Sequence, residues 1–173
     1  MKISPILFCI FVAIGSVTFN QAIGVENKQQ LPIEISSSYF KHNGKKNQTL
    51  YEGEVKLKQG NMELNADAIE IKSTAEGSII SIEARGNPAH FEHSFTEPNK
   101  PPILGQAQHI YYDKTNNILI LKGNAEMAQG SKIQMESDFI EYLADVEEVR
   151  AKGQSSAGHS QGRVNIIIPP AGD

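Results

Sequence analysis

Two acidic residues, Asp67 and Asp138, invite comparison with the paired carboxylates of glycoside hydrolases. Such enzymes place two acids about 5 to 10 Å apart, so that one protonates the leaving oxygen while the other assists attack. These aspartates, however, occupy equivalent places in two sequence repeats, where a turn leads into a strand and aspartate commonly bonds to backbone amides. Because repeats place equivalent residues in separate layers, the spacing favours a structural role over catalysis.

The histidines offer a second chemistry, because His90 and His93 form a His-x-x-His pattern. On a strand, residues three apart face opposite sides, so one metal ion cannot readily use both rings. His109 and Glu92 could join them only through a tertiary contact that the sequence does not show. The chain also carries no Gly-x-Ser-x-Gly elbow, phosphate loop or dinucleotide fingerprint. The sequence therefore predicts a protein that is not an enzyme and needs no metal or cofactor.

Composition narrows the class further. The chain has 173 residues, of which 39% are hydrophobic, with 16 basic and 20 acidic side chains and a net charge of −4. This is too apolar for a disordered chain and enough for one domain with a modest core. Nucleic-acid binding depends on a basic footprint that a net acidic chain does not provide, so no nucleic-acid partner is expected.

The N-terminus has the three parts of a secretory signal peptide. Lys2 precedes an apolar run over 6–17, and small residues lead to a cleavage site after Gly24. The run is shorter than the roughly 20 residues of a membrane-spanning helix, so we expect residues 1–24 to be cleaved. Because the single cysteine, Cys9, lies inside this segment, the mature chain lacks cysteine and has a net charge of −5. Export without disulfides indicates the bacterial periplasm.

Beyond residue 33 the chain alternates apolar and polar residues in short runs, as in 55–57, 62–64, 89–95 and 164–168. Alternation places apolar side chains on one face of a β-strand. The segment 137–150 has a helix-like composition but contains many β-formers, so it is interpreted as two strands turning at Ala144-Asp145.

A repeat organises these strands. Residues 53–60 align with 123–130, and each is followed by a similar segment, 66–71 or 137–142. Glycines at 53, 86, 123 and 153 mark repeated turns, with spacings typical of stacked supersecondary units. Because one unit cannot bury its own apolar face, stacked units must share one interior. The sequence predicts an all-β domain over 25–168: an elongated, twisted β jelly roll of about 16 short antiparallel strands with open ends, followed by a short tail over 169–173.

Several ordered segments carry a resemblance to a known family: 31–35, 51–60, 65–67, 86–91, 105–107, 121–125 and 163–169. The chain resembles the OstA-like family of periplasmic lipopolysaccharide-transport proteins across 25–173. The resemblance implies a jelly-roll protomer that stacks head to tail with itself and carries lipopolysaccharide by its lipid A moiety. It also implies two protein partners, an inner-membrane-anchored LptC-like protein and the N-terminal periplasmic domain of an LptD-like outer-membrane translocon.

Four apolar residues match family positions that contact lipid: Ile33, Ile35, Phe91 and Leu121. The alternative is that all four are ordinary core. Both interpretations can hold, because the interior of a transport groove is itself the core. A structural β-repeat scaffold that binds proteins without lipid remains a second hypothesis for the whole chain.

The last strand, 164–168, is β-prone and uncharged, and its residues Val164, Ile166 and Ile168 form a predicted oligomer edge. An exposed edge of this kind aggregates unless it is used, and addition of the first strand of the next copy would use it. Lys41, Lys45 and Lys46 cluster at an Asn-Gly hairpin signal. They form either a solvated turn or a contact for lipid A phosphates or an acidic partner.

Overall fold

The computed structural model describes residues 31–130, 133–153 and 162–168; the predicted signal peptide and the tail over 169–173 lie outside these ranges. The described residues form one antiparallel sheet of ten strands without a helix. None of them forms a helix that could cross a membrane. The strands are β1 (Glu34–Ser36), β2 (Tyr39–Asn43), β3 (Gln48–Gln59), β4 (Met62–Ser73), β5 (Ile79–His93), β6 (Ile103–Asp113), β7 (Ile118–Gln129), β8 (Ile133–Leu143), β9 (Glu148–Lys152) and β10 (Asn165–Ile167).

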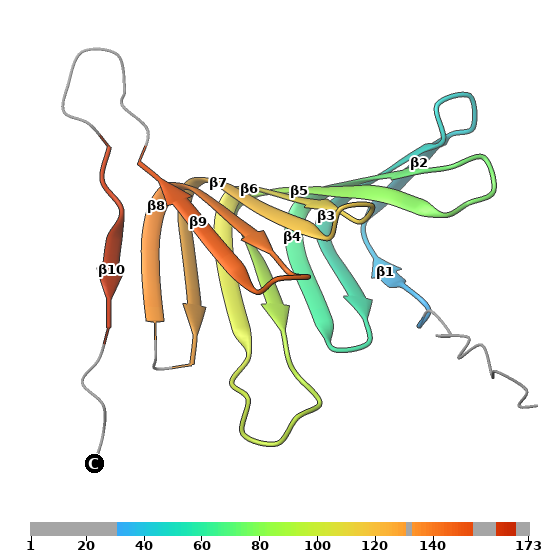
Figure 1. Cartoon of the computed structure of the whole chain (residues 1–173). Helices are drawn as coiled ribbons and strands as arrows, with labels where there is room; N and C mark the ends of the chain where they lie inside the picture. The colour runs from blue at the N-terminus through green and yellow to red at the C-terminus, as the bar shows by residue number, and fades with distance from the viewer. Residues whose placement is uncertain (1–30, 131–132, 154–161, 169–173) are drawn as a thin grey trace, which may run out of the picture. The chain divides into compact units, whose positions relative to one another are not determined.

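The sheet order follows the chain, from β1 and β2 at one end to β9 and β10 at the other (Figure 1). Strands β3 to β8 are long, with 11 to 15 residues each, and every one pairs with its sequence neighbours. Each end is completed by two short strands. Strands β1 and β2 pair with different parts of β3, and β9 and β10 pair with different parts of β8.

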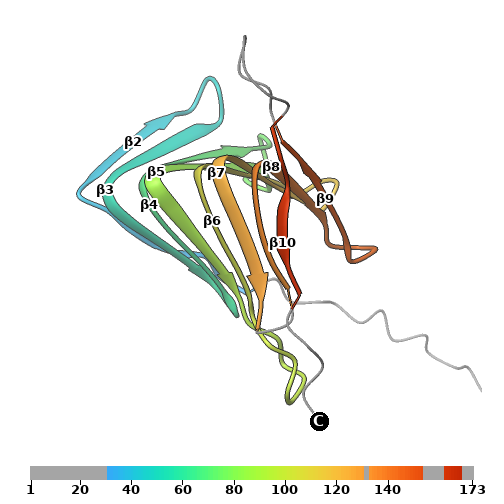
Figure 2. The same ribbon diagram turned by 90° about the vertical axis from the view of Figure 1, so that its left-hand side faces the viewer.

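A line of β-bulges crosses the sheet and folds it. On β3 and β4, Gly53 and Glu54 lie opposite the single residue Asp67, and on β7 and β8 residues 123 and 124 lie opposite Asp138. Register shifts continue the line through β5 and β6. Extra residues on one strand bend it and increase its twist. Figure 2 shows the two halves of the sheet diverging from this bend. We call them the upper half (39–52, 68–85, 109–122, 139–152) and the lower half (34–36, 55–66, 89–107, 125–137, 165–167).

The bulges also keep the apolar residues on one face through the bend. Ala66 and Ile69 are both buried although they lie three positions apart, a spacing that faces opposite sides of a regular strand. Ala107 and Ile110 show the same spacing on β6. Each break in alternation coincides with a register shift. The concave faces of both halves therefore stay apolar, and one core forms between them.

The all-β, antiparallel prediction is confirmed, but the described strands number ten rather than about 16. The prediction assumed short strands throughout, whereas β3 to β8 continue through the line of bulges. The repeated glycines explain the error, because Gly53 and Gly123 lie within strands at the bend and not in turns. Both have positive φ, 82° and 77°, which glycine adopts without steric cost. The two strands predicted around Ala144 are present as β8 and β9.

Candidate functional site

Two cross-strand rows of mostly apolar side chains, one in each half, run along the interior face. The lower row is Ile35, Leu57, Leu64, Phe91, Gly105, Met127, Met135 and Ile166. The upper row is Phe40, Tyr51, Ile69, Ala84, Ile110, Leu121, Ile140 and Ala151. Both rows run the whole length of the sheet. At the edges, Phe40 remains 59% exposed and Ile166 52% exposed, so the apolar interior is open at both ends.

In the middle of the sheet the two halves are in close contact. Leu64 and Phe91 from the lower half face Ile82, Ile110 and Leu119 from the upper half around a gap of only about 10 Å³. Ile69, Ile110, Leu121 and Ile140 are among the largest fully buried side chains. A space of this size holds at most one water molecule and has no room for an acyl chain. This part of the interior is a packed core.

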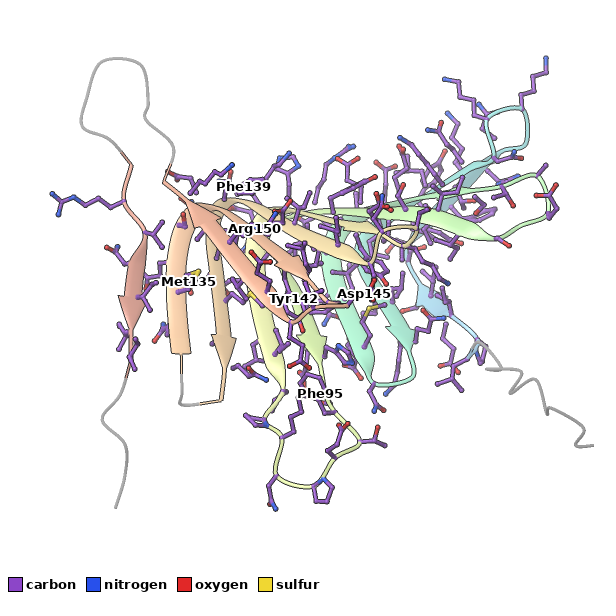
Figure 3. All side chains as sticks on the ribbon, in the orientation of Figure 1. Phe95, Met135, Phe139, Tyr142, Asp145 and Arg150 are labelled. Atoms are coloured by element: carbon purple, nitrogen blue, oxygen red, sulfur yellow. The ribbon has the colours of Figure 1, made fainter. Side chains whose placement is uncertain are left out.

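Toward β9 and β10 the interior opens into a cavity of about 180 Å³, which we call the C-terminal cavity. Its apolar lining includes Phe95 from the loop between β5 and β6, Met135 and Tyr142 from β8, and Val149 from β9; these can be followed in part in Figure 3. Methionine side chains adapt to ligands of irregular shape, and aromatic rings offer large apolar contact areas. Burial raises the pKa of Tyr142.

One basic and one acidic side chain lie at this cavity, Lys100 and Glu147. The Lys100 Nζ is 3.1 Å from the Glu147 Oε1 and 4.0 Å from the centre of the Phe95 ring. The Phe95 ring also stacks on His93, with ring centres 4.9 Å apart. Burial, and secondarily the charge of Lys100, lower the pKa of His93 below its ordinary value.

All four residues predicted to contact lipid lie on or against the interior face. Ile35, on β1, and Phe91, on β5, are half-buried in the lower row, and Ile33 packs against the core just before β1. Leu121, in the upper row, is 0% exposed. Three of the four side chains are therefore accessible from the interior, whereas Leu121 could meet a ligand only if the two halves separated.

The residues considered for catalysis or metal binding are not brought together. Three strands separate Asp67 on β4 from Asp138 on β8, which corresponds to roughly 19 Å at the usual strand spacing. His90 faces the outside and His93 the interior, as alternation predicts. His109 pairs across strands with Arg85 and Lys122, away from Glu92. Within the described ranges, no three histidine, cysteine, aspartate or glutamate side chains form a metal-binding group.

The predicted edge residues lie at the C-terminal end of the sheet. Ile166 is in β10 and pairs with Met135, while Val164 and Ile168 flank this strand. The strand is shorter than predicted, Asn165–Ile167 instead of 164–168. Lys41, Lys45 and Lys46 are exposed on β2 and on the turn that follows it, where Asn43 Oδ1 accepts bonds from the backbone amides of residues 45 and 46.

The C-terminal cavity was not predicted, although the sequence contained a signal for it. Three turns join strands at their upper ends: β2 to β3, β6 to β7, and β8 to β9. The last residues of these turns are Asn47, Asn117 and Glu147, and all three have positive φ. Asparagine tolerates this conformation well, so the glutamate is the exception. An alignment of the turns would have identified Glu147, but only the fold places it beside Lys100, 47 positions away.

The chain is therefore an open antiparallel sheet that is folded over an apolar interior, and this interior reaches both edge strands. The chain belongs to the family described as "LptA/(LptD N-terminal domain) LPS transport protein", whose sequence profile matches residues 34–154.

Individual relatives support this assignment. The chain is 27% identical over 165 residues to the "Lipopolysaccharide export system protein LptA" of Haemophilus influenzae, covering 94% of this chain and 91% of the relative. It is 27% identical over 151 residues to the protein of the same name in Escherichia coli K12, covering 87% and 77%. The fold is similar to the crystal structure of LptH, "the LptA homologous periplasmic component of the conserved lipopolysaccharide transport device from Pseudomonas aeruginosa", with a TM-score of 0.71, 23% identity and coverage of 81% and 96%.

Proposed function

We propose that this protein binds lipopolysaccharide in the periplasm and transports it, holding the lipid A acyl chains in the apolar interior. The observation that carries the proposal is the pair of apolar rows that run through the sheet and remain exposed at both edges. Each methylene kept from water contributes about 0.8 kcal/mol, so a lipid with several acyl chains needs such shielding to cross an aqueous compartment. The family membership and the names of the relatives support the same substrate.

Bridging by head-to-tail assembly is the second part of the proposal. Along one edge β1 and β2 run from the lower half to the upper half, and along the other edge β9 and β10 run from upper to lower. Copies stacked with their halves aligned would therefore meet through antiparallel strands, as everywhere else in the sheet. Ile166 of one copy and Ile35 of the next would extend the lower row across the joint, because both already belong to it.

The ends of such a stack would contact an inner-membrane-anchored LptC-like protein on one side and the N-terminal periplasmic domain of an LptD-like translocon on the other. The exposed edge strands and the apolar side chains beside them support these contacts, since an unpaired edge offers backbone donors and acceptors to a partner strand. Residues 1–24 are proposed to be a cleaved signal peptide that directs the chain to the periplasm. Movement in one direction would have to be driven elsewhere.

Lipid binding is tested by placing photo-crosslinking residues at Ile33, Ile35, Phe91 and Leu121 and exposing the protein to labelled lipopolysaccharide. Capture is expected at the three half-buried positions, and at Leu121 only if the halves separate during loading. An exposed position on the outer face, Glu63, provides the control. Absence of capture at all four interior positions, together with no co-purification of lipopolysaccharide, would contradict the proposal.

Assembly is tested by sedimentation of the full chain and of a deletion from Arg163 onward, which removes β10. The full chain should show concentration-dependent association, and the deletion should remain a folded monomer. Concentration-independent sedimentation of the full chain as a monomer would rule out head-to-tail assembly without affecting the lipid-binding proposal.

A protein-binding scaffold without lipid is the second candidate, favoured by the packed middle of the interior. The C-terminal cavity and the exposed ends of the rows favour the carrier. Transfer of labelled lipopolysaccharide from this protein to a second protein separates the two, because a scaffold would not carry lipid.

A further inference from the structure

The open side of the fold, opposite the bend, is bridged by an ion pair at the C-terminal cavity. Lys100 belongs to the loop over 94–102 at the lower ends of β5 and β6, and Glu147 to the turn at the upper ends of β8 and β9. The other ion pairs of the described residues join positions in one strand or in neighbouring strands. The Lys100–Glu147 pair is thus the one among them that connects the upper half to the lower half.

The ion pair lies at an apolar cavity, so a charged group and an apolar lining stand side by side, as a binding site for an amphiphile requires. Phe95, Met127, Met135, Tyr142 and Val149 offer contacts for a hydrocarbon chain. Lys100, whose side chain is 31% exposed, offers a cation beside that lining. The carboxylate of Glu147 occupies the position that an anionic head group would take, since it is bonded to the Lys100 ammonium at 3.1 Å.

The conformation of the turn does not explain why residue 147 is a glutamate. Its φ is 50°, and the equivalent residues of two sister turns are Asn47 at 49° and Asn117 at 53°. Left-handed backbone is far more accessible to asparagine than to glutamate. Glu54 adopts the same conformation at the bulge on β3, with φ of 47°, so the backbone alone does not assign a role to Glu147. What distinguishes Glu147 is the reach of its side chain across the open side to Lys100.

We propose that the Lys100–Glu147 pair is an exchangeable latch: a phosphorylated amphiphile binds with its chain in the C-terminal cavity and its phosphate on Lys100, and displaces Glu147. The inference rests on the proposed function and adds to it a position for the head group and the chemistry of that group. Exchange is feasible because ion pairs exposed to water are weak, and Glu147 is 70% exposed. A phosphate offers the ammonium more charge and more acceptors than a carboxylate does.

The test compares binding of dodecyl phosphate and dodecyl maltoside, below their micelle concentrations, by titration calorimetry on the mature chain. Glu147→Asn removes the competing carboxylate and installs the residue of the sister turns, so the variant should fold at least as well as the wild type. We expect it to bind dodecyl phosphate about two- to fivefold more tightly, the range given by the usual strength of an exposed ion pair. Binding of dodecyl maltoside should not change. Lys100→Gln should weaken binding of the phosphate at least several-fold and leave the maltoside unaffected.

Glu63→Gln is the matched control, because it breaks the exposed Lys58–Glu63 pair, 2.9 Å long, outside the cavity. Glu147→Gln, which keeps the side-chain length, repeats the test independently of turn geometry. Equal gains for phosphate and maltoside, or a gain no larger than that of Glu63→Gln, would overturn the latch. A parallel assay measures retention of labelled lipopolysaccharide by the wild-type chain. If the latch is overturned but lipopolysaccharide is retained, the proposed function stands. If the wild-type chain binds neither lipopolysaccharide nor either amphiphile, the proposed function itself fails.

Discussion

The middle of the interior and its C-terminal end share strands β6 and β7 but are filled differently. In the middle, Leu64, Ile82, Ile110 and Leu119 leave about 10 Å³ between the halves. At the end, strands β6, β7 and β8 continue into a cavity of about 180 Å³ lined by methionine and aromatic side chains. The short strands β9 and β10, which pair with separate parts of β8, replace a full-length neighbour there.

The difference separates the two tasks of an interior that must both stabilise a fold and accept a ligand. Branched aliphatic side chains that interdigitate contribute stability in the middle, because close-packed interiors gain both burial and dispersion energy. At the end, adaptable side chains leave space, and the Lys100–Glu147 pair connects the halves in place of packing. The middle should therefore respond to substitution through stability, and the end through binding.

The largest contrast is expected from truncation to alanine. Leu121→Ala should lower the free energy of unfolding by about 2 to 5 kcal/mol, because this fully buried side chain leaves a void that the sheet cannot close. Met135→Ala, at a half-buried position of the cavity wall, should cost no more than about 1 kcal/mol. Urea unfolding of both variants gives the comparison. Equal losses would show that the end is packed as tightly as the middle.

Enlargement should give a smaller contrast of the same kind. Ala84→Val adds two methyl groups at a 0% exposed position and should cost about 1 to 3 kcal/mol through overpacking. Val149→Leu, beside the cavity, should change stability by less than about 0.5 kcal/mol while reducing the space for a ligand. Thermal unfolding and amphiphile titration measure the two effects. A stability loss at Val149 as large as that at Ala84 would contradict the distinction.

Ser137 lies on β8 beside the bulge at the bend, outside the linings of both regions. Its hydroxyl is buried and has no hydrogen-bond partner among the described residues, and the equivalent positions on β4 and β6 are occupied by Ala66 and Ala107. Ser137→Ala should therefore leave stability unchanged or raise it by up to about 1 kcal/mol, since an unsatisfied buried hydroxyl is removed. Chemical denaturation would detect the change, and a clear destabilisation would indicate a bound water or ligand that satisfies the hydroxyl.

The smallest effect is expected from pH at the open end. Burial first, and then the charge of Lys100, lower the pKa of His93 below 6.5 in the folded chain. As the pH falls below about 6.5 the unfolded chain takes up this proton before the folded chain, so stability should decline. His93→Gln should lose less stability than the wild type between pH 7.5 and pH 5.5 in urea unfolding. Identical pH slopes would show that His93 does not contribute.

Much of the fold was predictable because alternation is a local property. Apolar residues two apart must share one face, which identified strands and the apolar end strand around Ile166. The interior residues Ile35 and Phe91 were singled out by the family resemblance. The described strands are fewer and longer than the predicted ones, because a bulge and a turn share the same signals, glycine and a break in alternation. At Gly53 and Gly123 only the pairing of the flanking residues with one continuous partner strand distinguishes them.

The sequence by itself determined the β class, the repeat and the apolar face, because each depends on residue types a few positions apart. The structure decided how that face is used. The bend brings the upper and lower rows together, buries Leu121 completely and leaves Phe91 half-buried, although alternation treats the two alike. It also joins Lys100 to Glu147 across 47 positions. Such contacts depend on where the sheet folds, and the fold follows from the summed packing of six long strands, which no local pattern encodes.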